Sequence, residues 1–150
     1  MEQRESIVLL RVRYSETDQM GSYYNAVALE WFECGRTDYL RLLGLPYTEI
    51  ESRGYFFPVV EAYLQFQGRA CYDDPLKVIT TSHWVSRIRL RFDEQIIHAE
   101  SGQRIVQGYT IHTVTNAAGR PARPPAWLVQ LWQEGQQHEQ DSNEASIERR

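Results

Sequence analysis

The chain has 150 residues, of which 42% are hydrophobic and 24% charged, and its formal net charge is -4. This length predicts one folded domain, residues 1–133, while the polar and largely acidic segment 134–150 predicts a flexible tail. The rest of the chain is nearly neutral, which excludes the basic surface of a nucleic-acid-binding protein. The apolar runs are far shorter than the roughly 20 residues that span a bilayer, so we expect no membrane insertion.

The first predicted element is a strand at residues 7–14, where branched apolar side chains are frequent. A polar segment containing Gly21 follows and predicts a loop. From residue 25 onward, apolar residues recur with the period of an α-helix. Asn25 is a favourable N-cap and Gly44 lies just past the last periodic residue, so we predict a helix at 25–43. Its predicted buried face comprises Ala28, Leu29, Phe32, Gly35, Tyr39 and Leu43.

Four extended segments follow a short stretch at 47–53 that is compatible with a helix. They lie at 56–67, 76–86, 88–99 and 104–115, and they are rich in β-branched and aromatic residues. Along the third of them, apolar residues alternate with Arg87, Arg89 and Arg91, which places these arginines on the opposite face. After three prolines, residues 126–133 predict a short C-terminal helix. This order predicts an α+β fold with a five-stranded antiparallel sheet packed on one long helix.

The cysteines and histidines give no sign of a metal site or a disulfide. The N-terminal residues lack the features of a secretory signal, so we expect a cytoplasmic protein in which Cys34 and Cys71 stay reduced and serve as packing residues. A nucleophilic thiol would need an electropositive niche, which the sequence alone does not exclude. The four histidines have no metal-ligand spacing, and a glycine-rich phosphate loop is lacking, so neither a metal nor a cofactor is predicted.

The segment from Arg13 to Asn25 places a carboxylate, Asp18, on a loop just before the predicted helix. The first amides of a helix lack intrahelical partners, and with the helix dipole they can polarise a carbonyl and stabilise an oxyanion. A carboxylate on the other side of the same carbonyl can activate a water or attack directly. The alternative is structural, because Asp18 can bond loop amides and Asn25 can cap the helix. The residues alone leave both interpretations open.

Several short motifs follow one another along the chain. They are Thr17-Asp-Gln-Met-Gly21, Trp31-Phe-Glu33, Gly35-Arg-Thr37, Phe57-Pro-Val-Val-Glu-Ala62, Ala70-Cys-Tyr-Asp-Asp-Pro75 and Gly119-Arg-Pro121. Through these motifs the chain resembles the acyl-CoA thioesterase family of the hotdog fold, and the resemblance covers nearly all of residues 6–130. The similar branch includes the 4-hydroxybenzoyl-CoA thioesterases and the Tol-Pal-associated thioesterases.

The resemblance implies a fold, an activity and a site. It implies a sheet curled around the helix, hydrolysis of an acyl-CoA thioester, and Asp18 as the catalytic carboxylate. The amide that polarises the carbonyl would lie at the helix start near Asn25. CoA would enter as part of the substrate, with no separate cofactor. Hotdog subunits associate through their sheets with the active site between two chains, so we expect a homodimer or homotetramer.

The sequence departs from the family pattern just after Gly21. Similar members usually have Val-Val-Tyr-His-Ala-Asn-Tyr where this chain has Ser-Tyr-Tyr-Asn-Ala-Val-Ala. Asn25 thus replaces a histidine, which removes an imidazole that could relay protons near neutral pH, although a backbone amide survives the exchange. Four alternatives therefore remain open, namely weak activity, an unusual acyl group, binding without hydrolysis, and action on acyl-carrier-protein thioesters.

Other positions are predicted to serve the same site. Glu61 is a second candidate carboxylate among apolar neighbours in its strand, with an ion pair to a strand arginine as the alternative. Tyr24 is predicted to line the acyl pocket or to pack in the core, and Gly21 to contact the substrate. The three strand arginines are predicted to bind the phosphates of CoA, with a solvated sheet face as the alternative.

Overall fold

The computed structural model describes residues 4–134 of the chain. Its elements are β1 (Ser6–Arg11), a 3-10 turn η1 (Tyr14–Glu16), α1 (Val27–Leu42), α2 (Tyr47–Ser52), β2 (Val59–Phe66), β3 (Pro75–Trp84), β4 (Arg89–His98) and β5 (Arg104–Thr113), followed by a helix at 126–134. The predicted strands and helices are confirmed, with ends shifted by a few residues. The predicted tail falls almost wholly outside the described residues.

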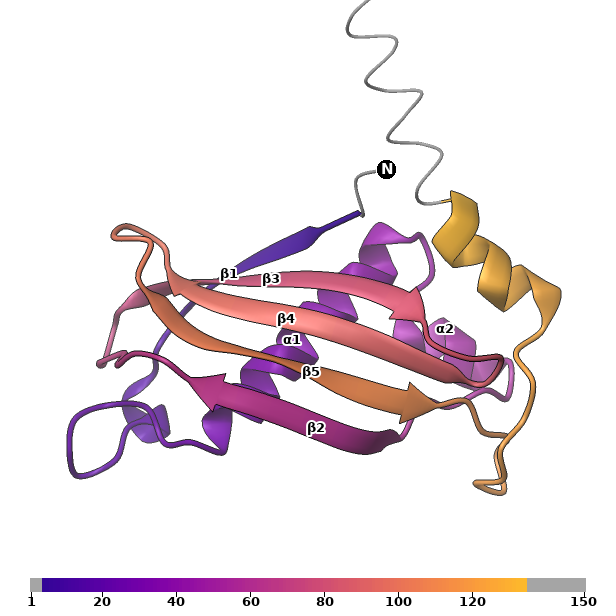
Figure 1. Cartoon of the computed structure of the whole chain (residues 1–150), viewed down its shortest axis with the longest axis horizontal. Helices are drawn as coiled ribbons and strands as arrows, with labels where there is room; N and C mark the ends of the chain where they lie inside the picture. Colours follow the sequence, from indigo (N-terminus) through magenta and orange to yellow (C-terminus); the bar gives the residue numbers. More distant parts are fainter. Residues whose placement is uncertain (1–3, 135–150) are drawn as a thin grey trace, which may run out of the picture.

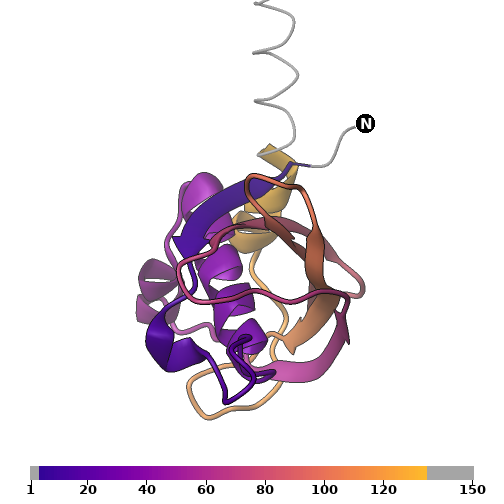
Figure 2. The same ribbon diagram turned by 90° about the vertical axis from the view of Figure 1, so that its left-hand side faces the viewer.

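The five strands form one antiparallel sheet in the order β1-β3-β4-β5-β2, so the first two strands of the chain occupy its two edges. The central pairing of β3 with β4 runs from Leu76 opposite His98 to Trp84 opposite Leu90. Figure 1 shows the strands in front of α1, and Figure 2 shows the sheet curving round one side of this helix. The α+β class with a five-stranded antiparallel sheet is therefore confirmed.

Helix α1 is amphipathic and packs against β1, β3 and β4. Its buried residues are Ala28, Trp31, Phe32, Gly35, Tyr39 and Leu40. The helix begins at Val27 with Ala26 as its N-cap, so the prediction that Asn25 is the N-cap is wrong. With 16 residues, α1 is the longest helix in the described chain but shorter than predicted, and α2 and the helix at 126–134 accompany it.

Two apolar clusters fill the space between the helices and the sheet. The first surrounds the N-terminal half of α1, where Trp31 and Phe32 pack with Val78 and Ile96 of the central strands. The second surrounds the C-terminal half of α1 and includes Tyr39 and Leu40, together with Leu128 and Trp132 from the last helix. The short C-terminal helix thus contributes apolar side chains to the core at one end of the domain.

Gly35 lies where α1 passes very close to the sheet. A Cβ atom at this position would overlap Thr80 Oγ1, Glu94 Oε1 and Val78 Cγ1, which belong to β3 and β4. On the same side, the Ser6 hydroxyl donates a long hydrogen bond of 3.5 Å to the Gly35 carbonyl. A mid-helix glycine costs about 1 kcal/mol in helix propensity, and the close approach of the sheet accounts for its presence.

We expect Gly35→Ala to lower the free energy of unfolding by about 1 to 3 kcal/mol, because overpacking outweighs the gain in helix propensity. Urea unfolding followed by circular dichroism measures the change. Cys34→Ala, at an exposed position of the same helix, is the matched control and should change stability little. A Gly35→Ala protein more stable than the native chain would show that the sheet relaxes around the added methyl group.

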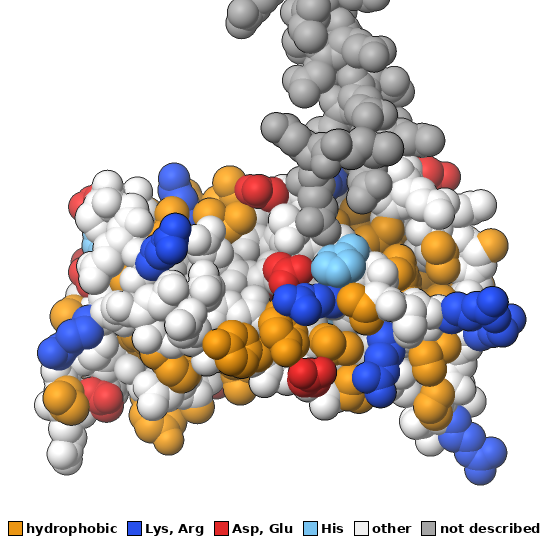
Figure 3. Space-filling view, viewed as in Figure 1, with side chains coloured by type: hydrophobic (Ala, Val, Ile, Leu, Met, Phe, Trp, Pro, Cys, Tyr) orange, Lys and Arg blue, Asp and Glu red, His pale blue; other side chains and the backbone are white. Residues whose placement is uncertain are grey.

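The outer face of the sheet is mixed in character. Figure 3 shows this face, with hydrophobic side chains gathered across the middle of the sheet and charged side chains among and around them. Along β4, Leu90, Phe92 and Ile96 are buried against the helix side, whereas Arg89 and Arg91 lie on the outer face. The predicted alternation is confirmed for Arg89 and Arg91, whereas Arg87 lies outside the strand, in the turn before β4.

Candidate active site

The loop that carries Asp18 is a tight hairpin between η1 and α1. Thr17 forms an isolated antiparallel bridge with Tyr23, and the Asp18 amide donates a 2.9 Å hydrogen bond to Ser22 O. Gly21 has φ of 77°, a left-handed conformation that glycine adopts without strain, and its amide donates to Asp18 O at 3.1 Å. These bonds place Asp18 near the tip of a hairpin whose second arm runs into α1.

The Asp18 side chain is exposed in the single chain. Its Oδ1 accepts a 2.8 Å hydrogen bond from the Met20 amide, which is the local turn geometry typical of aspartate. Its Oδ2 has no hydrogen-bond partner among residues 4–134. The structural and catalytic interpretations are thus compatible, because one oxygen orients the carboxylate and the other stays available for chemistry.

Glu16 anchors this hairpin to the helix, and the sequence did not single it out. Its side chain is buried, with Oε2 accepting a 3.0 Å bond from the Trp31 indole and Oε1 a 2.7 Å bond from the Arg13 amide. Its carbonyl oxygen accepts a 2.8 Å bond from the Tyr24 amide. A buried carboxylate with these partners fixes the loop of Asp18 relative to the first turns of α1, and so acts as a positioning residue.

The approach to α1 provides two unused backbone donors. The Val27 and Ala28 amides close the first turn, at 2.9 and 3.2 Å from their acceptors. The Asn25 and Ala26 amides donate to no group in the described chain, and both residues are exposed. Amides in this position, helped by the helix dipole, can polarise a carbonyl oxygen. Because a backbone donor does not depend on its side chain, asparagine at position 25 leaves it in place.

Tyr24 is 57% exposed in the single chain, so the alternative that it packs in the core is wrong. The buried tyrosine of this loop is its neighbour Tyr23, whose ring centroid lies 5.2 Å from that of Trp31 and 6.4 Å from that of Phe66. A role for Tyr24 in an acyl pocket, and a substrate contact for Gly21, stay predictions.

Glu61 lies on the exposed strand β2, where its apolar neighbours do not bury it in the single chain. Its Oε1 accepts a 3.0 Å hydrogen bond from the Tyr109 hydroxyl, and the Tyr109 ring stacks on Tyr63 with centroids 5.6 Å apart. Glu61 is thus not buried, and the arginine partner of the alternative interpretation is not found within residues 4–134. A catalytic role for Glu61 stays a prediction.

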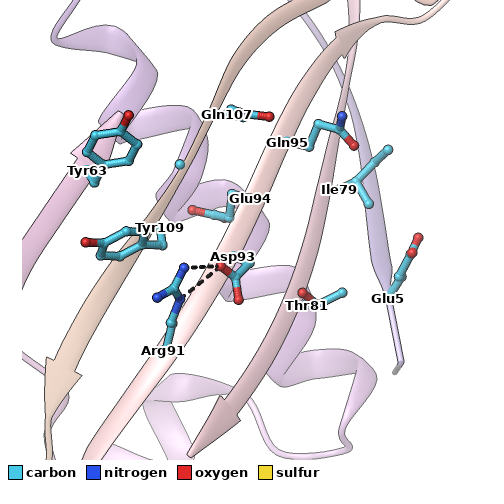
Figure 4. A pocket seen from close by; sticks show the side chains of 11 residues that line it. Glu5, Tyr63, Ile79, Thr81, Arg91, Asp93, Glu94, Gln95, Gln107 and Tyr109 are labelled. Carbon is cyan, nitrogen blue, oxygen red and sulfur yellow. Dashed lines mark hydrogen bonds and ion pairs between the residues drawn. The ribbon is translucent and has the colours of Figure 1, made fainter. Parts of the chain in front are cut away.

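The three candidate CoA arginines have different surroundings. Arg91 lies 2.9 Å from Asp93 Oδ1 and over the Tyr109 ring, 3.9 Å from its centroid. Arg91, Asp93 and Tyr109 line a hollow of about 460 Å³ on the outer face of the sheet, and Figure 4 shows their side chains there. Arg87, in the turn before β4, and Arg89 are exposed, and neither forms an ion pair with a described residue. Arg91 is therefore already paired, whereas the other two have the exposure that phosphate binding requires.

A second cavity, of about 270 Å³, lies between α1 and the ends of β2 and β5. Arg36 and Leu40 of α1, Phe57, Phe92 and His112 contribute to its lining. The sequence analysis did not identify this cavity. A signal was present in β5, because His112 is two residues before the buried Val114 and so falls on the inner face.

Both cysteines are exposed thiols, so the expectation that they are packing residues is wrong. Partial burial and the neighbouring carboxylate of Glu33 raise the pKa of the Cys34 thiol, which makes it a poor nucleophile. In the described part of the chain, His, Cys, Asp and Glu side chains form no group of three or more that could hold a metal ion. None of the helices between residues 4 and 134 has the length and hydropathy required to cross a membrane.

Comparison with known proteins gives results that agree with this geometry. The family described as the thioesterase-like superfamily matches residues 12–131. A Bacillus subtilis protein provisionally named an acyl-CoA thioesterase is 39% identical over 71 residues, which cover 47% of this chain and 51% of that protein. This match thus spans about half the length of the relative.

Two further matches cover more of the chain. A chloroplastic acyl-acyl carrier protein thioesterase of Arabidopsis thaliana is 27% identical over 119 residues, 79% of this chain and 63% of its own length. The crystal structure of DHNA-CoA thioesterase from Staphylococcus aureus is 29% identical, with a TM-score of 0.80 and 95% of each chain covered. The resemblance found in the sequence is confirmed, and because the family match extends over most of the chain, this protein belongs to the thioesterase-like superfamily.

Proposed function

We propose that this protein hydrolyses an acyl-CoA thioester to a free acid and CoA in the cytoplasm. Asp18 acts on the thioester carbonyl from one side, and the amides of Asn25 and Ala26 polarise its oxygen from the other. Water supplies the new oxygen of the acid, and CoA leaves as a thiolate that takes up a proton. CoA is part of the substrate, so the reaction requires no separate cofactor.

The observation that carries this proposal is the shared hairpin of Asp18 and the two unused amides. Asp18 keeps Oδ2 without a hydrogen bond in the described chain, and the same loop leads directly to the Asn25 and Ala26 donors. An oriented carboxylate on the loop that leads into free backbone donors supplies the two kinds of group that acyl transfer needs. Membership of the thioesterase-like superfamily and the names of the relatives support the same chemistry.

Two alternative functions use the same site. The relative from Arabidopsis thaliana is named an acyl-acyl carrier protein thioesterase, which favours a carrier-protein thioester as the second candidate substrate. The asparagine at position 25, where similar family members usually have histidine, favours a protein that binds acyl thioesters without cleaving them. Both alternatives differ from the proposal in a measurable product.

Purified protein is tested against short, long and aromatic acyl-CoAs, and against the same acyl groups on a carrier protein, with detection of the released thiol. Thiol release from acyl-CoA supports the proposal. Release confined to carrier-protein substrates supports the second candidate, and tight acyl-CoA binding without release supports the non-catalytic one.

We also propose that the active protein is a homodimer joined along β2, with each site between two chains. β2 is an edge strand in which only Leu64 is even partly buried, and Val60 and Phe66 are each 48% exposed. A long apolar edge with unpaired backbone groups is a template for pairing with another strand. A second copy on this edge would also shield the exposed Asp18 region, and a tetramer would need further contacts between such dimers.

Ala62→Lys is expected to convert the dimer to a monomer, because residues at the centre of β2 lie near the two-fold axis and two lysines would oppose each other. Ala62 is exposed in the single chain, so the lysine leaves the fold of the subunit intact. Sedimentation equilibrium measures the mass. Gln95→Lys, on the outer face of β4, is the control. If Gln95→Lys dissociates the protein and Ala62→Lys does not, the contact lies on the sheet face instead of the β2 edge.

A further inference from the structure

The cavity between α1 and the ends of β2 and β5 contains a largely buried cation, Arg36, with unused donors. Arg36 projects from α1, and its side chain is 16% exposed. It forms one hydrogen bond, 3.5 Å to Thr110 Oγ1, and one ion pair, 3.9 Å to Glu94 Oε2. These two long contacts leave most of the N–H donors of the guanidinium without a partner in the described chain.

The neighbouring polar groups do not use these donors. His112 Nδ1 lies 2.8 Å from Phe57 O, which only accepts, so the ring donates there and its Nε2 accepts from the Thr110 hydroxyl 2.8 Å away. The Thr110 oxygen then accepts the bond from Arg36. This chain of hydrogen bonds has a fixed direction and carries no negative charge, so it does not neutralise Arg36.

Glu94 compensates the charge of Arg36 only in part. Its side chain is fully buried, Oε1 accepts a 3.1 Å bond from the Thr80 hydroxyl, and Oε2 has no hydrogen-bond partner. Burial raises the pKa of Glu94 well above its usual range and outweighs the opposite effect of Arg36. Since the two side chains approach no closer than 3.9 Å and Glu94 Oε2 accepts no hydrogen bond in the described chain, Arg36 keeps donors that face the cavity.

The rest of the lining suits a hydrocarbon chain. Leu40, Phe57 and Phe92 form apolar walls, and exposed Glu33 and Val59 mark the side that opens to solvent. An apolar cavity with a few fixed polar groups is typical of small-molecule sites. The carboxylate of Glu33 is at the exposed rim, where water and salt screen it from a bound anion.

We propose that this cavity binds the far end of the acyl group and that Arg36 pairs with a carboxylate there, so that the preferred substrates are ω-carboxyacyl-CoA thioesters. The inference rests on the proposed thioesterase function. At the helical rise, the segment from Glu33 to Arg36 lies about 10 to 15 Å along α1 from the amide of Ala26. A medium-length dicarboxylic chain spans this distance, whereas a succinyl chain is too short.

The test compares ω-carboxyacyl-CoAs, from succinyl-CoA to sebacoyl-CoA, with n-acyl-CoAs of equal carbon number. The native protein is expected to prefer suberoyl-CoA over octanoyl-CoA by roughly tenfold to a hundredfold in kcat/KM, the scale of a charge-assisted hydrogen bond. The preference should vanish at succinyl-CoA. Arg36→Gln should abolish the preference, and Arg36→Lys should retain part of it, because lysine keeps the charge without the planar fork. Arg41→Gln, an exposed arginine on the same helix, is the matched control that keeps the preference.

The outcomes separate this inference from the thioesterase proposal. Equal rates for the two series at every length would overturn the inference and leave the thioesterase function standing. If neither series is hydrolysed, the thioesterase proposal fails, and calorimetric titration of the native protein with suberoyl-CoA and octanoyl-CoA decides the inference by their difference in affinity. The chain-length series in the native protein needs no substitution, so the test survives even if Arg36 proves necessary for folding.

Discussion

Asp18→Asn is expected to lower kcat/KM for acyl-CoA hydrolysis by about a hundredfold to ten-thousandfold, the usual contribution of a general base. The exchange is close to isosteric, and the asparagine carbonyl can still accept the Met20 amide, so the loop keeps its geometry. What is lost is an oxygen able to take a proton from water or to attack a carbonyl carbon. The rate of thiol release under saturating and limiting substrate measures the effect.

The control for this substitution removes the same charge at the same end of the helix. Glu30→Gln lies in the first turn of α1 and is exposed, so it changes the local field without touching the hairpin. We expect its rate to stay close to that of the native protein. Full activity in Asp18→Asn would place the chemistry elsewhere, and Glu61 would then be the next carboxylate to substitute.

Single turnover in oxygen-18 water addresses the two roles open to Asp18. Direct attack forms a mixed anhydride between Asp18 and the acyl group, and water attack on its aspartyl carbon leaves the label in the protein. General-base catalysis delivers the label only to the released acid. Label in the Asp18 side chain, or an anhydride trapped by a strong nucleophile, would identify the covalent route.

The helices and strands with a clear apolar period were predicted from the sequence. The prediction of which α1 residues face the core was less accurate. Leu29 was placed on the buried face of α1 and is 42% exposed, whereas Trp31 and Leu40 are buried and were not predicted. The reason is that α1 packs against β1, β3 and β4, so the sheet covers it from one side. A helical period gives the width of an apolar face but not the direction from which a sheet approaches.

The buried polar residues were missed because their partners come from distant parts of the chain. Glu16 is buried by the indole of Trp31, and Glu94 lies between Thr80 and Arg36. Charged residues are rarely buried unless they are paired, so a sequence rule places them in water by default. For Glu94 the sequence did contain a signal of burial, because the residue alternates in step with the apolar residues of β4.

Only the part of the candidate site whose residues are close in the sequence could be predicted. Asp18 and Asn25 are seven positions apart in the sequence, and a loop leading into a helix brings such residues onto one hairpin. The cavity of Arg36 and His112 depends instead on how α1, β2 and β5 pack, which spans much of the chain. Contacts of this separation are set by the whole fold and cannot be read from a local pattern.

Acidification is expected to destabilise the protein through His112, by about 3 kcal/mol between pH 6.5 and pH 4. Burial is the main cause that lowers the pKa of His112 from 6.5 to about 4. The hydrogen bond to Phe57 O acts in the opposite direction, and the positive charge of Arg36 lowers the pKa further. Between these values the unfolded chain binds more protons than the native one. Stability is therefore full above pH 6.5 and falls as the pH approaches 4.

Glu94 acts with the opposite sign, so the effect of His112 has to be measured by difference. Because the pKa of Glu94 is raised in the native protein, its contribution is complete at acidic pH and is lost as the pH rises through the native value. His112→Asn does not titrate and keeps an amide donor toward Phe57 O. Urea unfolding at pH 7 and pH 4.5 should show the native protein losing about 2 kcal/mol more than this variant. Equal losses would mean that the native cavity accepts a protonated imidazole, whose Nε2 would then donate to the Thr110 oxygen, so the Thr110–His112 hydrogen bond would have the opposite direction while Arg36 still donates to Thr110.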